Sequence, residues 1–205
     1  MKPKKVIPQT LLITHSTLRQ DWMDAAVEAG RGGIGHILLR DPGASAALMI
    51  TQAQTLQARL DNTMLLIHDR VDVALAVKAD GVHLPGHGLS PVQARTQLGP
   101  TALIGCSCHT VEQATVAFSQ GADYVTLSPL FATQSHPDAS PLGKERFSDM
   151  LNGIDGPVLA LGGITPDNAA IPLSLGAYGV AMIRGILDQK DPCDAVKKLR
   201  TLMKI

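Results

Sequence analysis

Two short glycine-containing segments near the C-terminus have the residue types of an anion-binding site. They read Leu161-Gly162-Gly163-Ile164-Thr165 and Ile183-Arg184-Gly185-Ile186. Adjacent glycines let backbone N–H groups approach an anion closely, and the guanidinium group of an arginine can form two charge-assisted hydrogen bonds with it. The alternative is that the glycines only form a tight turn and that Arg184 is a solvated surface charge. We expect Gly162, Gly163 and Arg184 to bind a phosphate group if the fold places the two segments side by side.

A second segment with possible chemistry is Cys106-Ser107-Cys108-His109. In a strand, successive side chains point to opposite faces, so an inward Ser107 sends Cys106 and Cys108 outward. Cysteine is also among the most frequently buried residue types, and a zinc site would need further ligands at suitable spacing. We therefore expect buried structural cysteines and no metal site here.

Short apolar segments that alternate with helical patterns position these residues. The apolar segments span residues 10–14, 34–40, 64–68, 81–84, 103–107, 124–127, 157–161 and 178–183. The clearest helical patterns cover residues 44–60, 111–120 and 191–203. Near-continuous apolar strands separated by helices indicate a parallel sheet that helices cover on the outside. Eight such units predict a closed (β/α)₈ TIM barrel, which needs roughly 200 to 250 residues, and we expect residues 1–205 to form it as a single domain.

In this fold the loops that follow the strands carry the chemistry, and phosphate groups bind after the seventh and eighth strands. The two glycine-containing segments occupy these positions. Ser128 to Gly143 is the longest irregular stretch, and a loop of that length is usually functional. The pairs Gly121-Ala122 and Gly176-Ala177 read as helix stops that lead into the next strand.

The composition favours a small-molecule ligand over a polymer. Basic and acidic residues both number 18, and aromatic residues make up 3% of the chain. There is thus no net field to attract nucleic acid and no set of aromatic side chains for stacking bases. No apolar run approaches the ~18 residues that span a bilayer, and three cysteines give no disulfide framework. We expect a cytoplasmic protein without a nucleic-acid or membrane partner, and the sequence leaves a homo-oligomer open.

Seven short segments in order resemble the superfamily of thiamine phosphate synthases and TenI-type thiazole tautomerases. They are Leu39-Arg40, 68–75, 79–84, 104–109, 121–125, 160–164 and 176–181. The stretch from Leu127 to Gly143 looks closest to the TenI-like domain that some bacteria fuse behind a Nudix hydrolase, although the 205 residues contain no Nudix domain. The resemblance implies a TIM barrel that binds a small phosphorylated thiazole or pyrimidine.

The synthases of this superfamily join a pyrimidine diphosphate to a thiazole phosphate and use Mg²⁺ to neutralise the leaving diphosphate. The resemblance assigns ligand binding to Arg40, Asp69, Ser107, Thr133, Ser135, Gly162 and Gly163. Four positions depart from the synthase pattern, where glutamine, lysine, aspartate and lysine are replaced by Leu38, Pro42, Gly88 and His136. All four departures fall on the diphosphate side, and three lost charge-assisted hydrogen bonds would cost on the order of 5–9 kcal/mol.

The tautomerases rely on a histidine two residues before the aromatic residue of the sixth loop, and that position holds Pro129. His136 and His68, which replace ligand-binding residues of the pattern, are the candidate catalytic residues. Pro137 restricts His136 to extended backbone conformations, and an imidazole both takes and gives protons near neutral pH. Asp69 is placed to orient His68. A passive loop histidine is an equally good interpretation of His136.

Three functions remain open at this stage. We rank first a TenI-like isomerase that acts on a thiazole phosphate by proton transfer without a cofactor. A synthase that tolerates the altered diphosphate side follows closely, and only this function would need Mg²⁺, held by Asp69. The third is a non-catalytic protein that binds a thiamine precursor.

Overall fold

The computed structural model describes residues 6–134 and 138–204. The strands are β1 (Thr10–Ile13), β2 (His36–Leu39), β3 (Met64–His68), β4 (Gly81–Leu84), β5 (Leu103–Cys108), β6 (Tyr124–Leu127), β7 (Val158–Ala160) and β8 (Gly179–Met182). The helices are α1 (Trp22–Arg31), α2 (Ala46–Arg59), α3 (Val71–Val77), α4 (Pro91–Leu98), α5 (Val111–Ser119), α6 (Gly143–Asn152), α7 (Ala170–Ser174), α8 (Arg184–Leu187) and α9 (Pro192–Met203).

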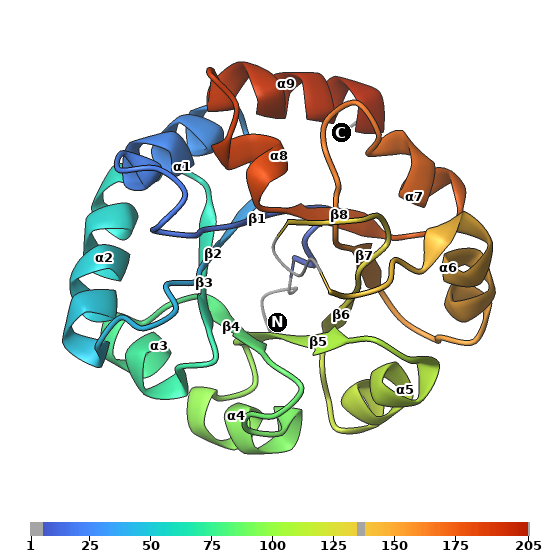
Figure 1. Ribbon diagram of the computed structural model, residues 1–205. Helices are drawn as coiled ribbons and strands as arrows, with labels where there is room; N and C mark the ends of the chain where they lie inside the picture. The colour runs from blue at the N-terminus through green and yellow to red at the C-terminus, as the bar shows by residue number, and fades with distance from the viewer. Residues whose placement is uncertain (1–5, 135–137, 205) are drawn as a thin grey trace.

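The strands close into a parallel barrel in chain order, with β8 paired to β1, and the helices surround it (Figure 1). This confirms the predicted TIM barrel. Each predicted apolar segment contains a strand, because its residues face either the barrel interior or the surrounding helices. The register aligns Ile13 of β1 with Leu38 of β2 and Leu12 of β1 with Met182 of β8. The ends of these three strands therefore lie next to one another at the mouth.

Two separate apolar clusters hold the barrel together. The interior cluster is small and contains Leu11, Ile13, Leu38, Leu66, Leu103, Tyr124, Leu159 and Ala181. The larger cluster lies between the strands and the helices, and alternate strand residues such as Leu12, Ile37 and Leu39 belong to it. Cys106 and Cys108 also belong to this outer cluster. This confirms that the two cysteines point away from the interior, as the strand alternation predicts.

Two aspartates that precede strands connect neighbouring strands to each other. The carboxylate of Asp80 accepts a hydrogen bond from the backbone N–H of Leu65 at 2.7 Å. Asp123 accepts one from Ile104 at 2.8 Å and also pairs with Arg95. The predicted helix stop before β6 is present, with Gly121 at φ +89°. Each Asp thus accepts a hydrogen bond from a backbone N–H at the amino end of the preceding strand. The predicted helix stops do not account for this role.

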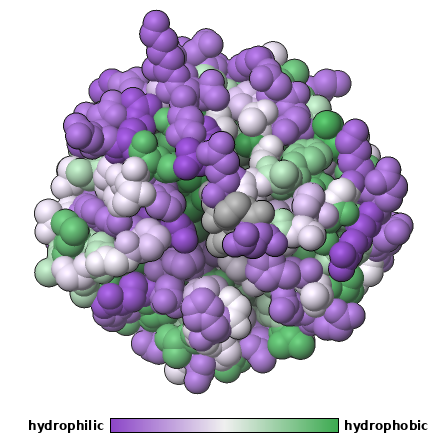
Figure 2. Space-filling view, in the orientation of Figure 1, coloured by the Kyte–Doolittle hydropathy of each residue, from purple (hydrophilic) through white to green (hydrophobic). Residues whose placement is uncertain are grey.

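None of the helices within residues 6–134 and 138–204 is long and apolar enough to cross a membrane. The face shown in Figure 2 carries mostly hydrophilic side chains, with hydrophobic ones scattered among them. The described parts of the long loop after β6, residues 128–134 and 138–142, lie over this end of the barrel (Figure 1).

Candidate active site

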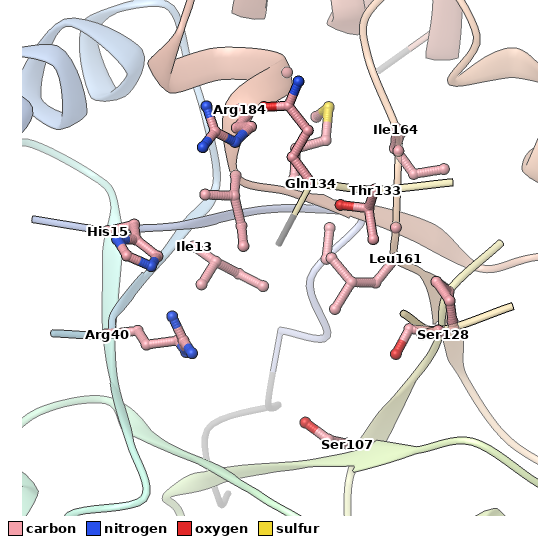
Figure 3. A pocket seen from close by; sticks show the side chains of 18 of the residues that line it. Ile13, His15, Arg40, Ser107, Ser128, Thr133, Gln134, Leu161, Ile164 and Arg184 are labelled. Atoms are coloured by element: carbon pink, nitrogen blue, oxygen red, sulfur yellow. The ribbon is translucent and has the colours of Figure 1, made fainter. Parts of the chain in front are cut away.

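A cavity of about 1070 Å³ opens at the carboxyl ends of the strands. Residues at or after the carboxyl ends of all eight strands line it, among them His15, Arg40, His68, Ser107, Thr133, Gly162 and Arg184. Several of these side chains point into the same space in Figure 3. Ligand pockets commonly measure ≈ 300–1,000 Å³, so this cavity is at the large end of the usual range.

The loop after β7 presents backbone donors to this cavity. The N–H groups of Gly162, Gly163 and Ile164 line the cavity and donate to no acceptor in the described part of the chain. Asn168 braces the loop, since its amide donates to the Gly163 carbonyl at 2.9 Å and its oxygen accepts from the Thr165 N–H at 2.8 Å. Successive free N–H groups form a concave site that favours an anion. This arrangement suits a phosphate group.

The packing of the β6 loop explains why two glycines stand here. A Cβ atom at Gly162 would lie 2.7 Å from Cα of Pro129, and one at Gly163 would lie 2.6 Å from the Ala132 carbonyl oxygen. Both glycines also have positive φ, +101° and +64°. The turn interpretation and the anion-binding interpretation are therefore compatible, because the close approach of the loops fixes the conformation that exposes the N–H groups.

Ser107 belongs to a polar chain inside the otherwise apolar barrel. Its hydroxyl lies 3.0 Å from Nε2 of His83, and Nδ1 of His83 lies 3.1 Å from the Tyr124 hydroxyl. Burial lowers the pKa of His83 to about 3, so the ring is neutral at physiological pH. Burial also raises the pKa of Tyr124, which stays protonated. His83 therefore holds Ser107 in place at the floor of the cavity.

The sequence did not single out this support. His83 and Tyr124 lie in two of the predicted apolar segments, 81–84 and 124–127, where nothing local marks them as partners of Ser107. Their partners lie 24 and 41 residues away along the chain, which no local pattern shows.

Arg40 is a partly buried cation without a counter-ion. Its backbone is fixed to the end of β1, since the Arg40 N–H donates to Thr14 Oγ1 at 2.9 Å and the Thr14 hydroxyl donates to the Arg40 carbonyl. No carboxylate within residues 6–134 and 138–204 pairs with its guanidinium. Burial lowers the pKa of Arg40, although a guanidinium keeps its charge in proteins. A buried charge without a partner is costly, so this residue is suited to bind an anionic ligand.

Comparison with known proteins shows which family the chain belongs to. The sequence model of the TMP-TENI family, described as thiamine monophosphate synthase, matches residues 10–186. A thiamine-phosphate synthase from Roseiflexus castenholzii is 41% identical over 180 residues, which cover 86% of this chain and 79% of that protein. A putative thiamine-phosphate synthase from Aquifex aeolicus is 34% identical over 89% of this chain and 99% of its own length. The chain belongs to the thiamine monophosphate synthase family.

A solved structure agrees with this membership. Thiamine phosphate pyrophosphorylase from Pyrococcus furiosus has a TM-score of 0.79 and 28% sequence identity to the chain, over 96% of both chains. The resemblance inferred from the seven segments is thus confirmed, and thiamine metabolism is the setting of the protein. Among the finer alternatives, the relatives favour the synthase over the TenI-like isomerase that the sequence analysis ranked first.

The structure shows what replaces the synthase pattern after β2. Leu38 takes the position of the glutamine, and it is 1% exposed in the interior cluster. Pro42 takes the position of the lysine, and it is exposed and outside the cavity lining. Arg40 alone remains from this part of the pattern.

Asp69 lies at the end of β3 with φ +63°, outside the cavity lining. A Cβ atom at Gly88 would come within 2.7 Å of Asp69 Oδ1, so position 88 faces this carboxylate directly. The second carboxylate of the synthase pattern would stand there, and the glycine removes it.

These residues do not fit the Mg²⁺ ion that the family implies. Mg²⁺ is bound by one or two carboxylates together with substrate phosphates. Asp69 is a single carboxylate, and it lies outside the cavity lining. No group of three or more His, Cys, Asp or Glu residues suitable for a metal occurs in the described chain.

His68 is a weak candidate for proton transfer. Burial, together with the nearby Arg40 guanidinium, lowers its pKa to about 4, and Asp69 opposes this shift only in part. The ring stacks near His83 at 6.5 Å between centroids and forms no hydrogen bond with Asp69. A group with this pKa is neutral and a poor base at pH 7, so the expected orientation by Asp69 is not found.

The remaining predicted residues fall into two groups. Thr133 lines the cavity, and Arg184 lines it at the start of α8. Ser135 and His136 lie outside the described residues, so their roles stay predictions. Pro129, in a cis peptide bond with Ser128, occupies the position of the tautomerase histidine and offers no titratable group.

Proposed function

We propose that this protein joins a pyrimidine diphosphate to a thiazole phosphate, with loss of diphosphate. The observation that carries the proposal is that one cavity has two separate anion-recognising ends. The free N–H groups of Gly162, Gly163 and Ile164 follow β7, and the Arg40 guanidinium follows β2. Figure 3 shows Ile164 and Arg40 on opposite sides of the cavity. An isomerase with one phosphate monoester would need only one of them.

Each end suits one substrate. A phosphate monoester matches the N–H groups after β7, because backbone donors bind an anion without a large side chain. The neutral Ser107–His83 pair offers a hydroxyl between the two ends for the heterocyclic ring of the pyrimidine. Arg40 matches the diphosphate, whose negative charge grows as its bond to the pyrimidine breaks and the bond to the thiazole forms. A guanidinium placed where charge develops stabilises that change.

The isomerase is the less well supported alternative. Proton transfer requires a group that titrates near neutral pH, and Pro129 and the low-pKa His68 do not supply one. His136 remains as a predicted proton-transfer residue outside the described chain. We expect the protein to act in the cytoplasm, where its three cysteines, which are free, would stay reduced.

The coupling reaction tests the proposal directly. Purified protein is incubated with the pyrimidine diphosphate and the thiazole phosphate, and product and released diphosphate are quantified by chromatography, with Mg²⁺ and with EDTA. We expect equal amounts of product and diphosphate. Isomerisation of the thiazole phosphate alone, without coupling, would replace the synthase by the isomerase, and binding without any turnover would leave a precursor-binding protein.

A further inference from the structure

Three adjacent strands end in basic or protonatable side chains at one corner of the cavity. His15 follows β1, Arg40 follows β2 and Arg184 follows β8. Because Ile13 pairs with Leu38, His15 is level with Arg40, two residues further along both strands. The pair Leu12 and Met182 likewise brings Arg184 next to the end of β1. All three side chains line the cavity, and Figure 3 shows them on the same side of it.

Two carboxylates of the described chain lie near this corner, and neither forms an ion pair with Arg40. Asp41 accepts hydrogen bonds from Ser16 and from the Gln52 amide. Asp188 pairs with Arg184 through Nη1 alone, at 2.9 Å. The Nε of Arg184 is buried and has no hydrogen-bond partner in the part of the chain described. Arg40, which has no counter-ion among the described residues, and the unpartnered Nε of Arg184 therefore leave cationic donors free to bind an anion in this corner.

We propose that this corner, formed by His15, Arg40 and Arg184, binds the diphosphate group without a metal ion. The proposal rests on the proposed function, and it names the residues that would bind the diphosphate in place of the lysines and the aspartate that this chain lacks. Asp69 and Gly88 lack the donor set for Mg²⁺, so the charge of the diphosphate has to be met by cations of the protein. Two guanidinium groups offer paired N–H donors that match phosphate oxygens. This assigns to the diphosphate an arginine that the sequence alone grouped with Gly162 and Gly163. Arg184 can turn its free donors to the ligand while Asp188 holds one nitrogen.

His15 gives the corner a dependence on pH. Burial lowers its pKa first, the charges of Arg40 and Arg184 lower it further, and Asp41 raises it in part. Its Nδ1 lies 3.1 Å from the Thr17 hydroxyl, which leaves Nε2 for a ligand. A bound diphosphate reverses the local charge and favours the imidazolium. Binding therefore takes up a proton, and the affinity rises as the pH falls.

Calorimetric titration with sodium diphosphate in EDTA tests the site apart from catalysis. We compare the wild type with His15→Asn, Arg184→Gln and the control His109→Asn at pH 6 and pH 8. His109 lines the same cavity after β5, on the other side from this corner. Diphosphate itself titrates in this pH range. The test therefore compares the proton uptake on binding between His15→Asn and His109→Asn.

We expect binding in EDTA, a loss of about tenfold or more in affinity for Arg184→Gln, and proton uptake that His15→Asn reduces and His109→Asn keeps. Binding that appears only when Mg²⁺ is added would overturn the proposal. So would equal proton uptake in the two histidine variants. If diphosphate binds as expected but the coupling assay yields no product, the proposed function fails while this site stands.

Discussion

The hydroxyl of Ser107 lies 3.0 Å from Nε2 of His83, and this contact ties the floor of the cavity to the barrel interior. His83 is 2% exposed and also contacts the hydroxyls of Tyr124 and Thr126. A histidine in this setting is neutral in the folded protein and protonated in the unfolded chain at mildly acidic pH. The same residue thus serves the cavity and makes the barrel sensitive to acid.

This arrangement predicts how stability depends on pH. Between pH 6.5 and about 3, the unfolded chain binds a proton at His83 that the folded protein does not bind, so the free energy of unfolding falls as the pH falls. One such proton contributes a slope of about 1.4 kcal/mol per pH unit below pH 6. His68, with a pKa of about 4, adds to the slope above that pH.

Urea denaturation of the wild type, His83→Gln and His68→Gln at pH 7, 6, 5 and 4 measures this slope. We expect each variant to have a shallower slope than the wild type, and His109→Gln, an exposed histidine, to keep it. Parallel pH profiles for wild type and His83→Gln would show that His83 is not the buried neutral group.

A second prediction concerns the glycine pair after β7. Gly163→Ala should lower the free energy of unfolding and reduce phosphate binding, because the Cβ atom would strike the Ala132 carbonyl oxygen and shift the N–H groups. Gly99→Ala is the matched control, since Gly99 also has a positive φ, +85°, but has open space around its Cβ position. It should cost only the backbone strain of about 1–3 kcal/mol, because Gly99, with ψ 177°, lies in a region that glycine alone adopts readily. Equal stability losses in the two variants would remove the packing argument.

Calorimetry with the thiazole phosphate measures the functional part of the same change. We expect Gly163→Ala to bind at least tenfold more weakly and Gly99→Ala to bind as the wild type does. Unchanged affinity in Gly163→Ala would mean that the free N–H groups are not the phosphate site.

Replacing Arg40 should raise the stability of the protein and weaken ligand binding. Arg40→Met removes a partly buried cation without a counter-ion and keeps the apolar part of the side chain, so the free energy of unfolding should rise by up to about 1 kcal/mol. Binding of the diphosphate substrate should weaken by about ten- to a hundredfold, which corresponds to one charge-assisted hydrogen bond or a pair of them. Arg146→Met on the exposed face of α6 is the control and should change neither quantity. A less stable Arg40→Met variant with normal binding would make Arg40 a structural residue.

Gly88→Asp should create a response to Mg²⁺ that the wild type lacks. The new carboxylate would face Asp69, since the Cβ position lies 2.7 Å from Oδ1. We expect millimolar Mg²⁺ to raise the melting temperature of Gly88→Asp by about 3–6 °C if the ion reaches ten times its dissociation constant. Gly88→Asn carries the same bulk without the charge and should not respond. A wild-type protein that Mg²⁺ stabilises equally would contradict our conclusion that its own donor set does not fit the ion.

The sequence predicted most of the fold because each strand carries a local signal. An apolar run such as Met64–His68 coincides with β3 in full. The glycine pair after β7 was also visible, since glycine types and position in the barrel are both local. The support of Ser107 by His83 and Tyr124 was not, because it joins three different strands. The corner of His15, Arg40 and Arg184 was missed for the same reason, as only the closed register brings β8, β1 and β2 together.

The central claim is that one cavity holds two phosphorylated ligands at separate ends, and a competition titration tests it most directly. The thiazole phosphate is titrated into protein alone and into protein saturated with diphosphate. We predict one-to-one binding with a dissociation constant that changes by less than about threefold, because the Gly162–Ile164 donors follow β7 whereas Arg40 and His15 follow β2 and β1. A dissociation constant that rises in proportion to the diphosphate concentration would show a single shared anion site, and the two-ended account would then be wrong.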